Sequence, residues 1–210
     1  MPDVHAGMGM PIGGVLACKD AVIPNAVGVD IGCGMCAVKS NYKVTDISQD
    51  VLRKKIMSGI RQRIPLGMVH HTEPQPECYL PEGHEIARME VVKRRQAAIV
   101  YEVGTLGGGN HFIELQKDEE GNLWVMLHSG SRNLGKLVCE HYNKQAQQLN
   151  ARWHTVVDEK LHLPFLPVGT EEFKKYWAEM QYCVDFALCN RRLMMQRVQE
   201  VLAEALPGIA

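Results

Sequence analysis

The stretch GTLGGGNHFIELQKDEEGNLWVMLHSGSR, residues 104–132, predicts a glycine-rich loop followed by a β-hairpin. Residues 111–115 alternate as a strand, a turn-forming segment follows, and residues 123–128 read as the returning strand. Antiparallel pairing places the start of one strand beside the end of its partner. We therefore expect His111 and His128 to lie at the same end of the hairpin, where both imidazoles can face one site.

Outside the hairpin, the sequence predicts a mixed α/β (α+β) fold in which a hairpin or sheet core is flanked by helices. The longest candidate helix, 171–205, carries apolar side chains three to four residues apart, as expected for a helix with one buried face. The remaining expected elements are strands at 15–18 and 35–38, helices at 46–63, 83–103 and 136–152, and a proline-containing loop at 64–82.

The bulk composition is that of an ordinary globular protein. The 210 residues are 46% hydrophobic and 22% charged, and the formal net charge is -1. This balance gives no signature of bulk nucleic-acid affinity, although it does not exclude a local basic groove. The seven scattered cysteines do not suggest a disulfide framework. There is no apolar run of about 18 residues and no secretory signal, so we expect no membrane partner and a cytoplasmic location.

Candidate metal ligands lie in the segment GVDIGCG, residues 28–34. Asp30 and Cys33 are three residues apart on a glycine-rich turn and can converge on one ion. Carboxylate oxygen suits manganese or magnesium, whereas thiolate suits zinc, iron or copper. The alternative is a buried cysteine beside a turn-forming aspartate. Cys33 and Cys36 also form a C-x-x-C pair, but a structural zinc site would need a second pair, and we expect Cys36 to be a core residue.

Candidate phosphate-binding residues occur in three places. Asn110 and His111 follow three glycines, whose backbone N–H groups can approach a phosphate closely. The segment HSGSR combines His128 with hydroxyls and a guanidinium before a helix, although it lacks the ending of a phosphate loop. The candidates for RNA or phosphate contact are His5, Ser129, Ser131 and Arg132. For each lone histidine, a structural role is the alternative.

Five segments together resemble the RNA-splicing ligases of the RtcB type. The matching blocks occur in the family's order: PDVHAGMGMPIGG at 2–14, GVDIGCG at 28–34, GTLGGGNHFIEL at 104–115, LHSGSRNLG at 127–135 and, more weakly, FALCNRRLMM at 186–195. Several blocks in order are far more specific than any one of them alone.

The resemblance implies an α/β fold of the RtcB type, with residues 1–210 forming part of its catalytic domain, and two Mn2+ ions in a cleft. Such enzymes join RNA ends carrying a 3′-phosphate or 2′,3′-cyclic phosphate to 5′-hydroxyl ends, through guanylylation of an enzyme histidine by GTP and transfer of that group to the RNA. The implied metal ligands are Asp30, Cys33, His111 and His128, with Cys33 bridging both ions. The implied guanine-nucleotide contacts are Asn110, His111, Phe112, Ile113 and Glu114.

Two departures from the family pattern shape the functional expectation. The family carries residues before the PDVH block and, downstream, a further metal-binding histidine and a His-Gly-Ala-Gly-Arg segment with the guanylylated histidine; this sequence has neither. We therefore expect a fragment that is inactive alone, with the missing C-terminal half as a possible partner and no catalytic nucleophile of its own. The alternatives are a nucleotide- or RNA-binding remnant or subunit without catalysis, and an unrelated metal hydrolase.

Overall fold

The computed structural model describes residues 4, 6–7, 9–155 and 157–209. Helices and strands are both present, which confirms the expected mixed fold class. The chain groups into two compact units. The first contains residues up to Ile31, Gly83–Gln96 and Asn133–Cys183, and the second contains Gly32–Glu82, Ala97–Arg132 and the residues from Val184 onward. Among the described residues, no helix has the length and apolar character needed to cross a membrane.

The elements follow the predicted order with a few differences. The strands are β1 (Ala21–Val22), β2 (Gly34–Lys43), β3 (Phe112–Lys117), β4 (Asn122–Ser129) and β5 (Leu166–Pro167). The α-helices are α1 (Pro24–Val27), α2 (Ser58–Arg63), α3 (Glu90–Glu102), α4 (Asn133–Arg152) and α5 (Glu171–Ala205). A π-helical segment, Val51–Met57, precedes α2, and short 3₁₀ turns occur at Val44–Asp46, Glu77–Tyr79, Ile86–Arg88 and Glu159–Leu161. The helix predicted at 171–205 is confirmed at both ends.

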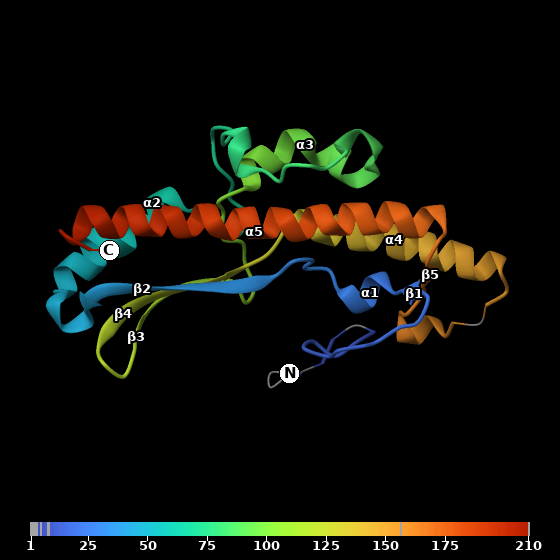
Figure 1. Cartoon of the computed structure of the whole chain (residues 1–210), viewed down its shortest axis with the longest axis horizontal. Helices are drawn as coiled ribbons and strands as arrows, with labels where there is room; N and C mark the ends of the chain where they lie inside the picture. Colours follow the sequence, from blue (N-terminus) through green and yellow to red (C-terminus); the bar gives the residue numbers. More distant parts are fainter. Residues whose placement is uncertain (1–3, 5, 8, 156, 210) are drawn as a thin grey trace. The chain divides into compact units, whose positions relative to one another are not determined.

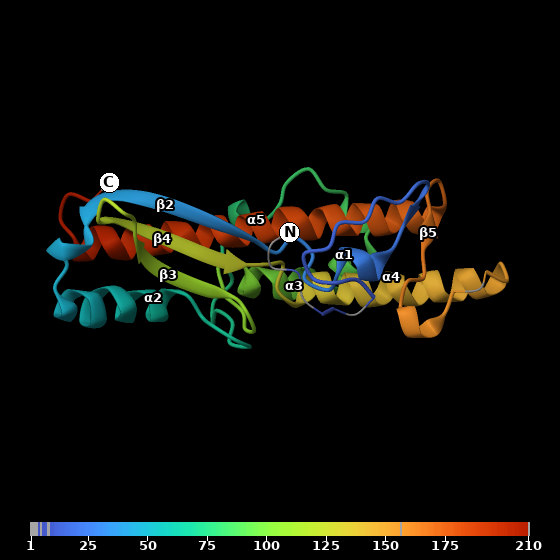
Figure 2. The same ribbon diagram turned by 90° about the horizontal axis from the view of Figure 1, so that it is seen from below.

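The second unit contains an antiparallel sheet with the strand order β2-β4-β3. Figures 1 and 2 show β4 between its two partners. In this register His128 of β4 is opposite Met35 of β2 on one side and Phe112 of β3 on the other. The predicted hairpin is therefore confirmed, and β2 extends well beyond the predicted strand at 35–38.

The hairpin turn is closed by Asp118. Its carboxylate accepts hydrogen bonds from the Trp124 indole N–H at 3.0 Å and from the Asn122 backbone N–H at 2.7 Å. These bonds, led by that from Trp124, hold the pKa of Asp118 well below its usual range. Gly121 has φ of +83°, a conformation that favours glycine. The turn thus fixes which residues of β3 and β4 are paired.

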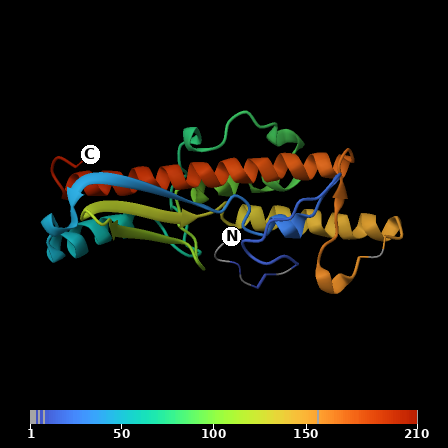
Figure 3. The ribbon, with the colours of Figure 1, turned by 60° about the horizontal axis from the view of Figure 1, so that its bottom comes forward.

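One face of this sheet builds the core of the second unit. Leu123, Val125 and Leu127 of β4 are buried, and the residues between them face the other side, as strand alternation requires. The buried cluster also includes Ile56, Ile60, Ile64, Met194, Met195, Val198, Val201, Leu202, Ala205 and Leu206. Figure 3 shows the C-terminal part of α5 running along the sheet. Burying each large aliphatic side chain contributes roughly 1.5–3 kcal/mol, so the sheet is held firmly against α5.

Several predicted elements differ from the structure. The helix expected at 83–103 is shorter, because α3 begins only at Glu90, after the 3₁₀ turn Ile86–Arg88. The strand expected at 15–18 is wrong, because these residues are exposed and form no ladder; Val15 is 87% exposed. The helix expected at 46–63 begins at 49 and is wound as a π-helix in its middle part. Ser48 caps this helix, since its hydroxyl accepts a hydrogen bond from the Val51 N–H at 3.3 Å.

In the first unit, Glu179 of α5 is a fully buried carboxylate that caps α3. It accepts hydrogen bonds from the backbone N–H groups of Glu90, Val91 and Val92 at 2.7, 2.9 and 2.8 Å. The Tyr142 hydroxyl of α4 also donates to it at 2.8 Å. Backbone N–H groups at a helix start have no partner within the helix, and they favour a negative charge. One side chain thus ties three helices together.

We predict that Glu179→Gln lowers the free energy of unfolding by about 1–3 kcal/mol, because an amide nitrogen cannot accept the N–H bonds that one carboxylate oxygen accepts now. The matched control is Glu171→Gln on the same helix, an exposed residue whose carboxylate pairs with Lys174, and this variant should have a urea midpoint close to that of the wild type. Urea unfolding of the two variants measures both values. Equal stabilities would contradict the capping role.

A half-buried basic cluster in the second unit involves Arg197 and His71. The Arg197 guanidinium donates to the Arg63 carbonyl at 2.9 Å and contacts His71 Nε2 at 2.9 Å, and it also bonds to Gln75. Burial and, secondly, the Arg197 charge lower the pKa of His71 from its ordinary value of 6.5. The neutral imidazole accepts from Arg197, so a proton on His71 would break this contact.

The sign of the pH effect follows from the lowered pKa of His71. Just below pH 6.5, His71 is mostly protonated in the unfolded chain but still mostly neutral in the folded chain, so stability falls as the pH falls. We therefore predict that the unfolding midpoint of the wild type falls more steeply from about pH 7.5 to about pH 5.5 than that of His71→Gln. Thermal melts across this range measure the difference, and parallel pH profiles would contradict the prediction.

Candidate metal centre

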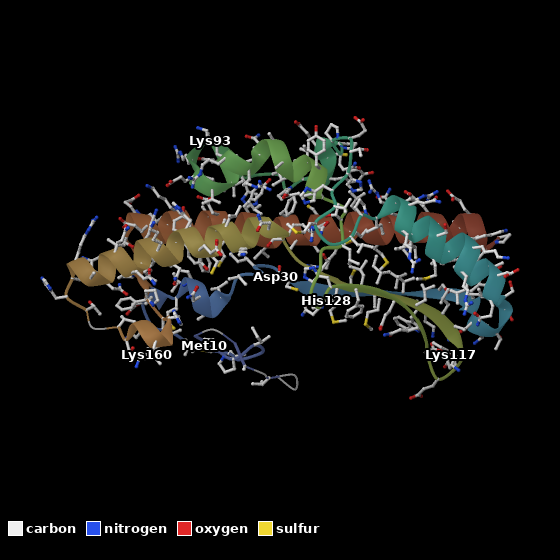
Figure 4. All side chains as sticks on the ribbon, turned by 180° about the vertical axis from the view of Figure 1, so that it is seen from behind. Met10, Asp30, Lys93, Lys117, His128 and Lys160 are labelled. Atoms are coloured by element: carbon white, nitrogen blue, oxygen red, sulfur yellow. The ribbon has the colours of Figure 1, made fainter. Side chains whose placement is uncertain are left out.

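Three side chains that are far apart in the sequence converge at one end of the sheet in the second unit. Cys33 precedes β2, His111 precedes β3, and His128 is near the end of β4. Cys33 Sγ lies 2.9 Å from His128 Nε2 and 3.6 Å from His111 Nε2. The two imidazole rings meet edge to face with centroids 5.5 Å apart. The expectation that both histidines share one end of the hairpin is confirmed; Figure 4 shows His128 at the end opposite Lys117.

Backbone carbonyls orient both imidazoles. His111 Nδ1 lies 3.0 Å from the Leu106 carbonyl oxygen, and His128 Nδ1 lies 3.2 Å from the Asn110 carbonyl oxygen. A carbonyl oxygen only accepts, so each Nδ1 must carry the hydrogen and each neutral ring keeps its lone pair on Nε2. This is the arrangement found in histidines that bind metals through Nε2. Both lone pairs therefore point toward the Cys33 sulfur.

The glycines before His111 make this approach possible. Gly107 has φ of +91°, and a Cβ at this position would collide with the Arg132 guanidinium and lie 2.6 Å from His111 Nδ1. A Cβ this close would force the Arg132 guanidinium and the His111 ring to shift from their present positions. The loop can thus pass close to the imidazole only because residue 107 has no side chain.

The donor set fits a cation. Cys33 contributes one sulfur donor atom, and each of the two imidazoles contributes one nitrogen donor atom through Nε2. A thiolate and two imidazoles can together coordinate one shared cation, and this set of sulfur and nitrogen donors suits zinc, iron or copper. All three side chains are partly buried, which strengthens their electrostatic interactions.

The two other candidate ligands in the 28–36 region, Asp30 and Cys36, lie in different surroundings. Asp30 is partly buried and lies three residues before Cys33 in the chain. It belongs to the N-terminal segment of the first unit, which ends at Ile31. Three residues span at most about 11 Å, so chain connectivity keeps this carboxylate in the neighbourhood of Cys33. Its part in a metal site stays a prediction. Cys36 packs on the core of the second unit, as expected, and burial raises the pKa of its thiol.

Residues 110–114 divide between the two faces of the sheet. Phe112 and Glu114 lie on the side of His128, and the Phe112 ring meets His128 edge to face at 5.7 Å. Ile113 lies on the opposite side and packs against the core. Asn110 and Glu114 are exposed. Nucleotide contact by this stretch stays a prediction, and only the residues on the outer face present side chains for it.

Two of the candidate phosphate contacts, Ser129 and Arg132, have internal hydrogen-bond partners, whereas the buried Ser131 hydroxyl has none among the described residues. Ser129 and Ser131 are fully buried, and the Ser129 hydroxyl donates to the Leu106 carbonyl at 2.8 Å. Arg132, with φ of +56°, donates to the Thr105 hydroxyl at 2.8 Å and to the Gly67 carbonyl at 2.7 Å. Contact with RNA by these residues stays a prediction. His5 lies outside the described residues.

The sequence reasoning missed two residues around this centre, Asn190 and Arg191 of α5. The Asn190 side chain is fully buried and bonds to the loop at Gly104 and to the end of β4. Arg191 bonds to the carbonyls of Gly32 and Ser129. An asparagine directly after the apolar residues 186–189 of a helix is the one local signal that marks a buried polar partner.

Comparison with known proteins adds independent information. A family profile described as tRNA-splicing ligase RtcB matches residues 1–209. The chain is 33% identical over 215 residues to the RNA-splicing ligase RtcB of Escherichia coli strain K12, covering 96% of this chain and 52% of that protein. It is 29% identical over 252 residues to the tRNA-splicing ligase RtcB of Archaeoglobus fulgidus, covering 98% and 52%. The chain thus spans about half the length of these curated relatives.

The family match agrees with the motifs found in the sequence. It includes the segments that carry Cys33, His111 and His128, and it extends through the whole of α5. The resemblance seen in five separate blocks is therefore confirmed over nearly the full chain. The chain belongs to the tRNA-splicing ligase RtcB family.

Proposed function

We propose that this chain supplies part of the metal centre of an RNA ligase, which joins RNA 3′-phosphate or 2′,3′-cyclic phosphate ends to 5′-hydroxyl ends using Mn2+ and GTP. The observation that carries the proposal is the approach of Cys33 Sγ to the Nε2 atoms of His111 and His128. RNA or tRNA splicing is the activity named for the curated relatives. Residues 1–210 would be one part of the catalytic domain.

Cys33, His111 and His128 would hold Mn2+, with Asp30 as a fourth ligand. The thiolate and the carboxylate offset the positive charge, while the neutral imidazoles add directional lone pairs. When bound, divalent ions polarise the phosphate and the attacking oxygen. The chain's own contribution is to fix the Nε2 atoms, since the carbonyls of Leu106 and Asn110 prevent either ring from turning freely.

The outer face of the hairpin beside this centre would receive the guanine nucleotide. Asn110 and Glu114 are exposed polar side chains next to the metal ligands, and Phe112 offers an aromatic edge. None of the nine histidines in the sequence is assigned as the guanylyl acceptor. Binding of nucleotide or RNA without catalysis is therefore the alternative activity for this chain by itself.

We predict that Cys33→Ser weakens Mn2+ binding by at least about 10-fold, because even partners that only support a metal ligand typically contribute 10–100-fold. Cys78→Ser, which alters an exposed thiol, is the matched control and should bind like the wild type. Electron paramagnetic resonance of free Mn2+ measures the affinity. Equal affinities in the two variants would exclude Cys33 as a ligand.

We also predict that, with Mn2+ at low salt, the chain binds RNA with a 3′-phosphate more tightly than RNA with a 3′-hydroxyl, since the terminal phosphate can contact the ion. His128→Ala should abolish this preference, whereas His154→Ala should retain it. Gel-shift titrations measure the difference; low salt is needed because phosphate contacts weaken steeply with salt.

Labelled GTP and Mn2+ distinguish the ligase assignment from simple binding. Preference for 3′-phosphate RNA without a covalent guanylate is the result expected for this chain by itself. A stable guanylyl–protein adduct would contradict the view that this chain lacks the guanylyl acceptor. Binding that ignores the terminal phosphate would contradict the proposed function.

A further inference from the structure

Asn190 and Arg191, adjacent on α5, together bond to every chain segment that carries one of the three converging side chains. These segments are the loop before β2, the loop before β3 and the end of β4. All of them lie in the second unit, as do both α5 residues. Since the three segments are distant in sequence, side chains that reach all of them can fix their mutual positions.

Arg191 links the Cys33 segment to the His128 segment. One guanidinium nitrogen, Nη1, donates to the Gly32 carbonyl at 2.7 Å and to the Ser129 carbonyl at 2.9 Å. Gly32 precedes Cys33 and Ser129 follows His128, so this bridge sits one residue away from each. A Cβ on Gly34 would lie 3.3 Å from the guanidinium carbon, which leaves little room for any other residue there.

Asn190 links the loop before His111 to the end of β4. Its Oδ1 accepts from the N–H groups of Gly104 and Thr105 at 2.7 and 3.1 Å. Its Nδ2 lies 3.1 Å from the Thr105 carbonyl, 3.2 Å from the Ser129 hydroxyl oxygen and 3.1 Å from the Gly130 carbonyl. The amide is fully buried and its donors and acceptor are all used.

The contact with Ser129 continues to the imidazole of His111. The Ser129 hydroxyl accepts from Asn190 and donates to the Leu106 carbonyl at 2.8 Å. The same carbonyl accepts from His111 Nδ1 at 3.0 Å. A continuous run of hydrogen bonds therefore connects a residue of α5 to the ring whose Nε2 faces Cys33.

We propose that Asn190 and Arg191 are positioning residues of the metal centre: Arg191 sets the approach of Cys33 to His128, and Asn190, through Ser129 and the Leu106 carbonyl, sets the orientation of His111. Neither residue touches the cation. The inference rests on the proposed function and assigns to α5 the control of metal affinity at that site. A purely structural role would stabilise the fold and leave the affinity of folded protein unchanged.

The test compares conservative variants with a matched control. Asn190→Asp keeps the acceptor oxygen and the shape but removes the N–H donors, and Arg191→Lys keeps the charge but removes the guanidinium. Arg192→Lys is the control, because Arg192 is the adjacent exposed arginine. Ser129→Ala removes only the hydroxyl that connects Asn190 to Leu106, and it serves should the buried carboxylate of the Asn190→Asp variant prevent folding.

The first measurement is cobalt(II) titration of the 210-residue chain, followed by the thiolate-to-cobalt absorption, after circular dichroism has confirmed folding. We expect about 10- to 100-fold weaker affinity for the Asn190, Arg191 and Ser129 variants and no change for Arg192→Lys. The double variant of Asn190 and Ser129 should lose less than the product of the single losses, since both act through one hydrogen bond. Folded variants with wild-type affinity and an unchanged absorption spectrum would overturn the proposal.

The second measurement separates this inference from the proposed function. Long-range nitrogen–proton NMR of the metal-free protein reports whether His111 carries its hydrogen on Nδ1. We expect this signature in the wild type and in Arg192→Lys, and a mixture of tautomers in Ser129→Ala and Asn190→Asp. Failure of the wild type to bind any cobalt would contradict the metal function alone. Unchanged His111 signals in both variants would contradict the positioning role, whatever the metal result.

Discussion

The pairing of β4 with both β2 and β3 is the constraint on which the centre depends. It places Met35, His128 and Phe112 level with one another across the sheet. Cys33 and His111 lie only one or two residues beyond these paired positions, so the register alone brings them to one end. A slip of one residue would turn His128 toward the core and Leu127 outward. The buried face of β4 against α5 therefore protects the geometry of the centre.

Around that register, main-chain atoms do much of the orienting. The carbonyls of Leu106 and Asn110 hold the two imidazoles, and the loop that supplies the Leu106 carbonyl fits because Gly107 lacks a side chain. This loop is fastened in turn to α5 through Asn190. Helix α5 thus packs on the core side of the sheet and also holds the loop that precedes His111. The packing that stabilises the second unit therefore also fixes the geometry of the site.

The spacing of apolar and turn-forming residues predicted those elements whose structure depends on neighbouring residues in the sequence. The hairpin, its turn at Asp118 and the long helix 171–205 follow from alternation, turn chemistry and helical spacing. Hydrogen bonds between distant segments leave no such trace, so the roles of Asn190 and Arg191 were missed. Nothing in the sequence indicated that Ser129, a candidate phosphate contact, is buried and bonds to Leu106; its contact with phosphate stays a prediction. The strand expected at 15–18 was wrong because apolar residues alone do not supply a partner strand.

We infer that Cys33, His111 and His128 jointly bind one cation. X-ray absorption at the manganese edge of the Mn2+-loaded chain tests it most directly, since it reports which elements surround the metal. We predict one sulfur and imidazole nitrogens among the nearest atoms, with the sulfur contribution lost in Cys33→Ser. A coordination shell made of oxygen alone in the wild type would contradict joint binding by these three side chains.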